Sequence, residues 1–226
     1  MKPPVFRRMF DYDRALLPNR RLAELENGVT TIDEARARSG ASIGYPGWGL
    51  LYHILLSHLD RNREEILIET GTNQGATTII LAQALIDAGC AGRVLTFELE
   101  ESNADIAEAN YAIAGVSARI VMHRGDVRKT FPSAIAGVSG LRFAFLDASH
   151  LEADVMFEFT TLLPHLADDG LVIFDNTYCI ANGNEDQRVN GALKKIQSEY
   201  GGNLINFENV SWFTPGLAIW QKAPKL

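Results

Sequence analysis

The chain has 226 residues, of which 46% are hydrophobic and 22% are charged, and its formal net charge at pH 7 is −7. This composition is that of a soluble globular protein and predicts one domain with a single large core. The acidic balance argues against nucleic acid as a partner, because proteins that bind the phosphate backbone usually carry a basic face.

The sequence also argues against a membrane protein. Its longest apolar run, TTIILAQALI, is far shorter than the roughly 20 residues that a membrane span needs, and no apolar stretch follows the arginine-rich start as in a secretion signal. We therefore expect a cytoplasmic protein. Its two cysteines, Cys90 and Cys179, have no metal-binding spacing and are too few for a disulfide framework, so both are expected to be free thiols.

From residue 65 onward, apolar runs of β type alternate with amphipathic stretches, which is the pattern of βαβ units on a parallel sheet. The predicted strands are 65–69, 93–98, 118–123, 141–147 and 170–175. The predicted helices are 76–89, 102–115, 129–137, 151–166 and 186–202.

Two further apolar runs, 203–210 and 216–222, are joined by a connection too short for a helical crossover, so they are expected to pair antiparallel. The predicted fold is a doubly wound, Rossmann-like α/β sheet of seven strands, mostly parallel with an antiparallel last strand. Residues 1–60 are polar and arginine-rich at first and then carry the helical apolar spacing of LLYHILLSHLD. We interpret them as a helical cap or lid on a core of residues 61–226, within a single domain.

The first predicted strand leads into the turn E-T-G-T-N-Q-G-A-T, with Glu69 at the strand end and Gly71 and Gly75 flanking the turn. At this edge of a doubly wound sheet, glycines let the backbone approach a ligand, and the following helix offers N–H groups to an anionic group. The dinucleotide fingerprint G-x-G-x-x-G is missing. An NAD-linked oxidoreductase is therefore disfavoured and stays an alternative.

Acidic residues also follow the next two strands. Glu98 ends the second strand, where its carboxylate can accept both hydroxyls of a ribose, and Asp126 follows the third in a G-D pair, placed to accept from an adenine amino group. The order E-x-G-x-x-x-G, acidic strand end and G-D resembles a class I S-adenosylmethionine-dependent methyltransferase over roughly residues 65–221.

This resemblance implies a set of cofactor-binding residues. Those around the methionine part of S-adenosylmethionine are Gly71, Thr72, Gly75 and Thr77; Glu98 holds the ribose, Asp126 faces the adenine, and Glu69 supports the loop and the amino group.

Two later strands, which we expect beside the first, end in oxygen-bearing side chains. FLDASH contains Asp147, and LVIFDNT contains Asp175 and Asn176. Strand interiors avoid these residues, so they either turn the chain or point oxygen ligands at something. Three oxygen donors at one edge of the sheet suit a hard divalent ion, Mg²⁺ before Mn²⁺ or Ca²⁺. The alternative is a metal-free methyltransferase in which these side chains touch cofactor or substrate.

The order Asp, then Asp-Asn, resembles the metal-dependent small-molecule O-methyltransferases of the catechol O-methyltransferase type. It implies that Asp147, Asp175 and Asn176 hold the metal and that Asp147 also lies beside the cofactor. That group often has a lysine base three residues after the first aspartate, where this chain has His150, and in this respect it is more similar to methyltransferases acting on macrolide sugars. Histidine titrates near neutrality and can take a proton from a hydroxyl; its alternative role is to cap or pack against the next helix.

We therefore expect an S-adenosylmethionine-dependent, divalent-metal-dependent O-methyltransferase with His150 and Asp147 as catalytic residues. Its partner is a small-molecule hydroxyl acceptor with adjacent oxygens, such as a catechol, a sugar or another diol. The alternatives are a metal-independent methyltransferase, the NAD-linked oxidoreductase and a non-catalytic protein that keeps the cofactor fold. The sequence leaves open whether the protein is a single chain or a homo-oligomer.

The acceptor pocket is the least specific part of this prediction. Residues 177–190 are expected to be either a lid over the substrate or a long connection. The aromatic candidates for the pocket, each of which can instead belong to the core, are Tyr45, Trp48, Tyr178, Trp212 and Phe213.

Overall fold

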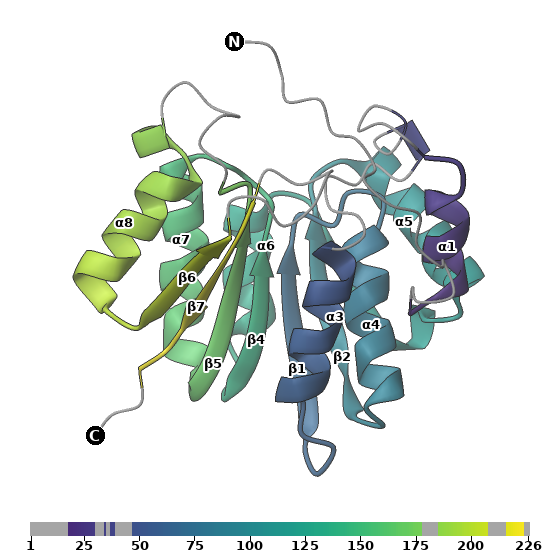
Figure 1. Ribbon diagram of the computed structural model, residues 1–226, viewed down its shortest axis with the longest axis horizontal. Coiled ribbons are helices and arrows are strands. Elements are labelled where there is room, and N and C mark those ends of the chain that lie inside the picture. Colours follow the sequence, from purple (N-terminus) through teal and green to yellow (C-terminus); the bar gives the residue numbers. More distant parts are fainter. Residues whose placement is uncertain are drawn as a thin grey trace.

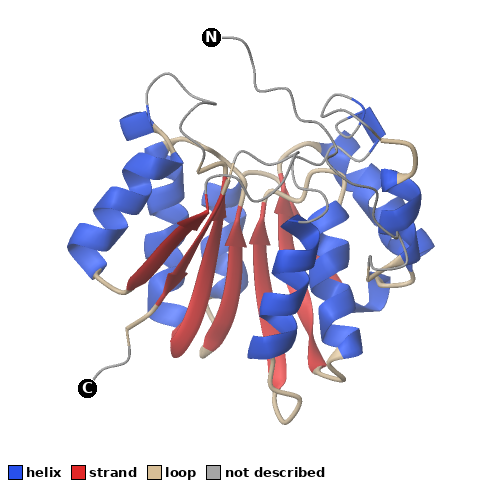
Figure 2. Ribbon diagram, in the orientation of Figure 1, coloured by secondary structure: helices blue, strands red, loops and turns tan. Residues whose placement is uncertain are grey.

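The fold is a seven-stranded sheet with helices on both faces (Figures 1 and 2). The computed structural model describes residues 18–29, 34, 37, 38, 47–177, 185–207 and 216–223. The strands are β1 (Glu64–Thr70), β2 (Ala91–Glu98), β3 (Ile120–Arg124), β4 (Leu141–Leu146), β5 (Leu166–Asp175), β6 (Asn203–Phe207) and β7 (Leu217–Gln221). The helices of the described part of the chain include α1 (Arg20–Glu26), α3 (Gly47–His58), α4 (Ala76–Asp87), α5 (Glu101–Ala114), α6 (Val127–Ile135), α7 (Glu152–Leu162) and α8 (Val189–Tyr200).

The order of strands across the sheet is β3-β2-β1-β4-β5-β7-β6. The pairs from β3 to β5 are parallel, and β7 runs antiparallel to both β5 and β6. This topology confirms the predicted fold class, including the antiparallel pairing of the last two strands. The carboxyl ends of the parallel strands meet at one edge of the sheet, the upper edge in Figure 1.

Both faces of the sheet are buried, as in other sheets whose parallel strands are joined by helices. Successive residues of β1 show this: Leu67 packs into the hydrophobic cluster with α3, α4 and α5, whereas Ile68 packs into the cluster with α6, α7 and α8. Both side chains are fully buried. The strand therefore reads as a continuous apolar run in the sequence and not as an alternating one.

Several boundaries differ from the sequence prediction by a few residues, and three of these differences have a clear local cause. Residues Ser117–Arg119 form a short 3₁₀ turn, so β3 begins at Ile120 and not at residue 118. The strand β5 begins at Leu166 and not at residue 170, because Leu166 already pairs with Leu141 of β4.

The third difference is the start of α6, which begins at Val127 and not at residue 129. Asp126 caps the helix, since its carboxylate accepts a hydrogen bond from the Arg128 N–H at 2.9 Å.

The expectation that the fourth and fifth strands are both neighbours of the first was wrong for the fifth: β4 pairs with β1, and β5 lies one strand further away.

The described helices of residues 1–60 belong to the helical layer on one face of the sheet. The helix α3 confirms the predicted helical segment and packs beside α4, and α1 lies against α5 (Figure 1). Buried leucines of both helices, Leu22, Leu51 and Leu55, join the core cluster on this face. The division into a cap and a core stays a prediction. Within the described part of the chain, no helix has the length and apolar character of a membrane span.

We expect Gly71→Ala to be far more destabilising than an ordinary glycine substitution. Gly71 has a φ of +82°, and a Cβ there would lie 2.2 Å from the carbonyl oxygen of Asp147. Gly115, which caps α5, has a similar φ of +73° but open space around the same position, so Gly115→Ala is the matched control. In urea unfolding, Gly71→Ala should lose at least about 2 kcal/mol more than Gly115→Ala. Equal losses would show that the close contact with β4 is unimportant.

Candidate active site

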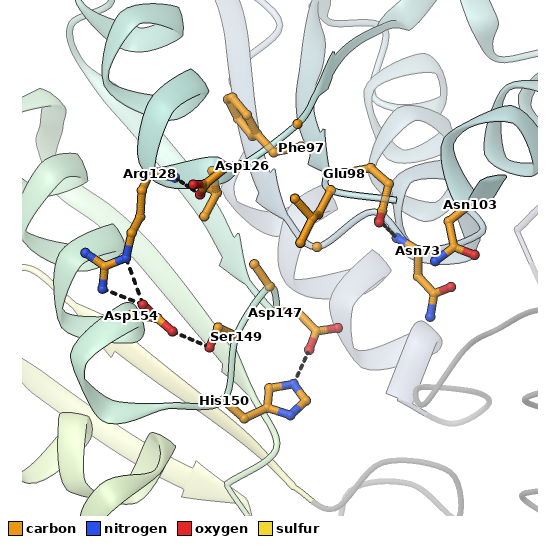
Figure 3. Close-up of a pocket in the computed structure, with 15 residues that line it drawn as sticks. Asn73, Phe97, Glu98, Asn103, Asp126, Arg128, Asp147, Ser149, His150 and Asp154 are labelled. Atoms are coloured by element: carbon orange, nitrogen blue, oxygen red, sulfur yellow. Dashed lines mark hydrogen bonds and ion pairs between the residues drawn. The ribbon is translucent and has the colours of Figure 1, made fainter. Parts of the chain in front are cut away.

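A cavity of about 730 Å³ opens at the carboxyl edge of the parallel strands (Figure 3). The ends of β1 to β4 and the loops that follow them contribute to its lining, and four residues predicted from the sequence lie there: Gly71, Glu98, Asp126 and Asp147. The other predicted cofactor-binding residues are buried in the loop after β1 or in the strand and helix that flank it, and they do not line the cavity; they are Glu69, Thr72, Gly75 and Thr77. Half of the predicted cofactor-binding residues thus line the same cavity.

Glu98 is held at the cavity wall by the backbone of two loops. Its side chain accepts hydrogen bonds from the N–H of Asn73 at 2.6 Å and of Glu100 at 2.9 Å, one on each carboxylate oxygen. The residue is only 7% exposed, yet it lines the cavity. Since a carboxylate has about four acceptor sites, each oxygen can still accept from a hydroxyl group in the cavity.

The loop after β1 has an unusual backbone. Gly71, Asn73 and Gly75 all have a positive φ, and Asn73 is the non-glycine residue among them, at +48°. Asparagine tolerates the left-handed region better than most residues, but such a conformation still has to be held in place by its surroundings. Asn73 lines the cavity and was missed in the sequence, where an Asn between two turn glycines is its only signal.

A polar network lies beneath this loop and is centred on Glu69. One oxygen of its carboxyl group accepts from the hydroxyls of Thr78 and Thr96, and Thr96 contacts the hydroxyl of Thr72 in the loop. The other oxygen has no hydrogen-bond partner among the described residues. Burial raises the pKa of Glu69 to about 8, although the two threonine hydrogen bonds oppose that shift. This shift favours the neutral form of the carboxyl group near pH 7.

A second buried carboxyl group, that of Glu158 on α7, supports the end of β4. Its oxygen accepts from the Thr70 hydroxyl at 2.6 Å. The carbonyl oxygen and the hydroxyl oxygen of Thr70 in turn accept from the Asp147 N–H, at 3.0 Å and 3.3 Å. Burial raises the pKa of Glu158 to about 8. Glu158 was not predicted from the sequence, although its place beside Val155 and Phe159 on the apolar face of a helix was a usable signal.

The polar residues at the ends of β4 and β5 converge, as predicted. The Nδ2 atom of Asn176 lies 3.3 Å from Asp147 Oδ1, 3.0 Å from Asp175 Oδ2 and 2.9 Å from His150 Nε2. His150 Nε2 also lies 3.3 Å from Asp147 Oδ1 (Figure 3). Asn176 reaches this position with a φ of +59°. Asp147 and His150 line the cavity, and Asp175 is almost fully buried behind them.

The charges around His150 shift its titration. Burial lowers the pKa of the imidazole, but the hydrogen bond with Asp147 and the negative charges of Asp147 and Asp175 outweigh it, so the net pKa is raised. His150 thus belongs to the polar cluster at the strand ends.

The donor set of this cluster fits the predicted divalent ion. Among the described residues, no group of three or more His, Cys, Asp or Glu side chains is arranged to hold a metal, so the prediction depends on the amide of Asn176. That amide now directs its NH₂ group at both carboxylates, and turning it over would direct its oxygen there. Two carboxylates and one amide oxygen are ligands of the hard type that Mg²⁺ takes. The metal site stays a prediction.

Another wall of the cavity was not predicted at all. Arg128 donates from Nε to Asp154 Oδ1 at 2.9 Å, and Ser149 of the FLDASH stretch donates to Asp154 Oδ2 at 2.6 Å (Figure 3). The guanidinium of Arg128 also lies over the Phe157 ring, 4.7 Å from its centre. These contacts tie the start of α6 to the loop after β4. No local motif marks them, because the partners come from separate segments of the chain.

The predicted acceptor pocket falls largely on residues that the structure does not describe. Tyr45, Tyr178, Trp212 and Phe213 lie outside the described residues, as do the side chain of Trp48 and the thiol of Cys179. The same holds for residues 178–184 of the predicted lid, 177–190. Cys90 is a buried free thiol, as expected.

We expect the Glu69→Gln variant to change how stability depends on pH. The folded pKa of about 8 lies above the value of 4.5 for an exposed glutamate. Between these values the unfolded chain releases a proton that the folded chain keeps, so the free energy of unfolding falls as pH rises, by up to about 1.4 kcal/mol per pH unit. In urea unfolding of the ligand-free protein from pH 5 to pH 8, the variant should lose less stability than the wild type.

The control for this experiment is Glu64→Gln, on the same strand, whose side chain is 57% exposed. It should follow the wild type across the pH range. Glu158 contributes with the same sign in all three proteins and cancels in the comparison. Parallel curves for Glu69→Gln and the wild type would mean that Glu69 is ionised in the folded protein.

Known proteins share this fold and part of this sequence. Residues 68–177 match the model of a methyltransferase domain family, Methyltransf_24. A stretch of 82 residues is 37% identical to the catechol O-methyltransferase of Mycobacterium tuberculosis; it covers 36% of this chain and spans only 35% of that protein.

Two solved structures resemble the whole chain. An O-methyltransferase from Bacillus cereus, in complex with S-adenosylhomocysteine, has a TM-score of 0.70 at 23% identity and covers 95% of this chain and 93% of that chain. The O-methyltransferase TomG from Streptomyces achromogenes, in complex with S-adenosylmethionine, has a TM-score of 0.69 at 18% identity, with 95% and 92% covered. Residues 68–177 thus match a methyltransferase domain, and the chain has the Rossmann-like fold of these O-methyltransferases, which is the fold that the class I resemblance of its motifs predicted.

Proposed function

We propose that the protein is an S-adenosylmethionine-dependent O-methyltransferase that uses a divalent metal ion and acts on a small molecule with two adjacent oxygens. The observation that carries the proposal is that one cavity has Glu98 and Asp126 on its wall together with the Asp147 and His150 cluster. Groups suited to a nucleoside and groups suited to proton transfer thus face the same space. The similarity to a catechol O-methyltransferase supports this reading.

The charge of the cavity supports a cationic cofactor. Four carboxylate residues line it, against one arginine, Arg128, that is already paired with Asp154. The sulfonium centre of S-adenosylmethionine is positively charged, so negative groups around it favour its binding over that of an anionic ligand. In this proposal Glu98 accepts from the ribose hydroxyls and Asp126 faces the adenine.

The remaining cofactor residues lie in the loop after β1 and in the strand and helix beside it. Gly71 and Gly75 give the backbone the positive φ values that the loop requires, and the loop surrounds the methionine part. Thr72 is buried in the loop and Thr77 in the first turn of α4. Glu69 accepts from Thr78 of that helix and is linked to Thr72 through Thr96. Of these residues only Gly71 lines the cavity, as Glu98 and Asp126 do, and the others hold the loop in place.

The metal ligands in this proposal are Asp147, Asp175 and Asn176. Mg²⁺ bound beside an acceptor hydroxyl would lower the pKa of that hydroxyl. Asp147 and Asn176 also contact the imidazole of His150 and orient it. The imidazole takes the hydroxyl proton, the acceptor oxygen forms a bond to the methyl carbon, and the carbon–sulfur bond breaks to leave S-adenosylhomocysteine. Holding the two reactants in line supplies much of the rate.

We expect His150→Gln to lower kcat and to leave cofactor binding intact. Loss of a general base usually costs about 100-fold to 10,000-fold in rate. The reaction to follow is transfer of a labelled methyl group from S-adenosylmethionine to a panel of catechols and sugar diols. The Kd of S-adenosylhomocysteine should stay within about twofold of the wild type, because His150 takes no part in holding the nucleoside. An undiminished kcat would remove His150 from the mechanism, and failure of the wild type on every diol would overturn the acceptor class.

The proposed metal site can be tested by a binding measurement that does not depend on methyl transfer. Calorimetric titration of Mg²⁺ into the wild-type protein saturated with S-adenosylhomocysteine should give binding at one site. Asp175→Ala should abolish that signal, because it removes one of the three oxygen ligands. An unchanged signal in the variant, or none in the wild type, would contradict the metal site and leave metal-free methyl transfer with His150 as the base.

A further inference from the structure

The loop after β1 is held from the side by α5. Asn110 of this helix is 4% exposed, and its Nδ2 donates a hydrogen bond to the carbonyl oxygen of Gln74 at 2.8 Å. Gln74 lies between Asn73 and Gly75, the two loop residues with positive φ that follow Gly71. The hydrogen bond therefore fixes the middle of the part of the loop with the least favourable backbone.

The next residue of α5 packs against the same loop. A Cβ at Gly75 would lie 2.5 Å from Cε1 of Tyr111, so the ring of Tyr111 fills the space beside this glycine. The Tyr111 hydroxyl also donates to Thr78 in the first turns of α4, at 3.0 Å. The Tyr111 ring thus limits the position of the loop, and the hydrogen bond from Asn110 limits the orientation of its peptide groups.

The orientation of the Asn110 amide is set by the N-terminal helix. Arg21 of α1 donates to Asn110 Oδ1 from Nη2 at 2.8 Å and from Nε at 3.2 Å. A guanidinium has donors only, so the amide oxygen must face Arg21 and the amide NH₂ group must face the Gln74 carbonyl. The hydrogen-bonded chain runs from α1 through α5 to the loop.

This loop forms part of the cavity wall. Gly71 and Asn73 line the cavity, and the Asn73 N–H holds the Glu98 carboxylate at 2.6 Å. Asn110 and Arg21 are not among the lining residues, so they act on the cavity only through the loop. A change in the Gln74 peptide would be passed to Asn73, its neighbour, and from there to Glu98.

We propose that Asn110 is a positioning residue for the cofactor loop, oriented by Arg21, and that α1 thereby raises cofactor affinity without contacting the cofactor. The inference rests on the proposed binding of S-adenosylmethionine. Sequence reasoning had no means of finding it, because Arg21 and Asn110 lie 89 positions apart and Asn110 and Gln74 lie 36 apart.

Calorimetric titration of S-adenosylhomocysteine into the full-length protein tests the proposal. Asn110→Asp keeps the size of the side chain and its acceptor for Arg21 but has no donor for the Gln74 carbonyl. We expect its Kd to rise about tenfold, which corresponds to about 1.4 kcal/mol. In steady-state kinetics, the KM for S-adenosylmethionine should rise while kcat at saturating concentrations of both substrates stays within about twofold of the wild type.

The matched control is Gln83→Ala. Gln83 of α4 accepts a hydrogen bond from Asn19, the residue before α1, at 2.8 Å, and so belongs to the same interface without contacting the loop. Its Kd should stay within twofold of the wild type. A general loosening of α1 would raise the Kd of both variants alike, and that result would overturn the specific role of Asn110.

A second variant covers the case in which Asn110→Asp does not fold. Arg21→Met keeps the apolar stem of the arginine, which is only partly exposed, and removes its donors. It should raise the Kd at least threefold, and a Kd within twofold of the wild type would overturn the inference. Wild-type protein that binds no S-adenosylhomocysteine would overturn the proposed function itself, whereas equal binding by wild type and Asn110→Asp would overturn only the role of Asn110.

Discussion

The contact between Gly71 and the carbonyl of Asp147 is the constraint on which the site depends. Because residue 71 has no side chain, the loop after β1 and the end of β4 lie against each other with backbone touching backbone. The hydrogen bond from the Asp147 N–H to the Thr70 carbonyl, at 3.0 Å, joins the same two segments. The part of the cavity suited to a cofactor and the part suited to proton transfer are thereby set at a fixed separation.

Two buried carboxyl groups brace this junction from opposite faces of the sheet. Glu69 bonds to a hydroxyl of α4, and Glu158 is carried by α7. Burial raises the pKa of each to about 8. The shifts favour the neutral form of both groups near pH 7, beside a cavity that already has several carboxylates on its wall. They act as hydrogen-bond acceptors that hold hydroxyls in place.

The N-terminal helices add to this arrangement from a distance. The helix α3 widens the layer beside α4, and α1 reaches the cofactor loop through Asn110. In the sequence, residues 1–60 differ from the βαβ pattern that follows them, and they were interpreted as a cap on that ground. The described helices α1 and α3 pack on one face of the sheet, and α1 is also linked by hydrogen bonds to the loop after β1. Both contributions depend on contacts with α4 and α5, which lie later in the chain.

The succession of strands and helices along the chain, and the residues at the strand ends, could be predicted from the sequence. Apolar runs, turn glycines and acidic strand ends are local patterns, and parallel strands bring their carboxyl ends to one edge, so Gly71, Glu98, Asp126 and Asp147 could be predicted to meet. The partners of Glu158, Arg128, Asp154 and Asn110 became known only from the folded chain. Each lies in a helix or at its start, and its function depends on which segment packs opposite. Which segments pack against each other depends on the burial of both faces of the sheet by the helices, and a local sequence pattern contains no information about that packing.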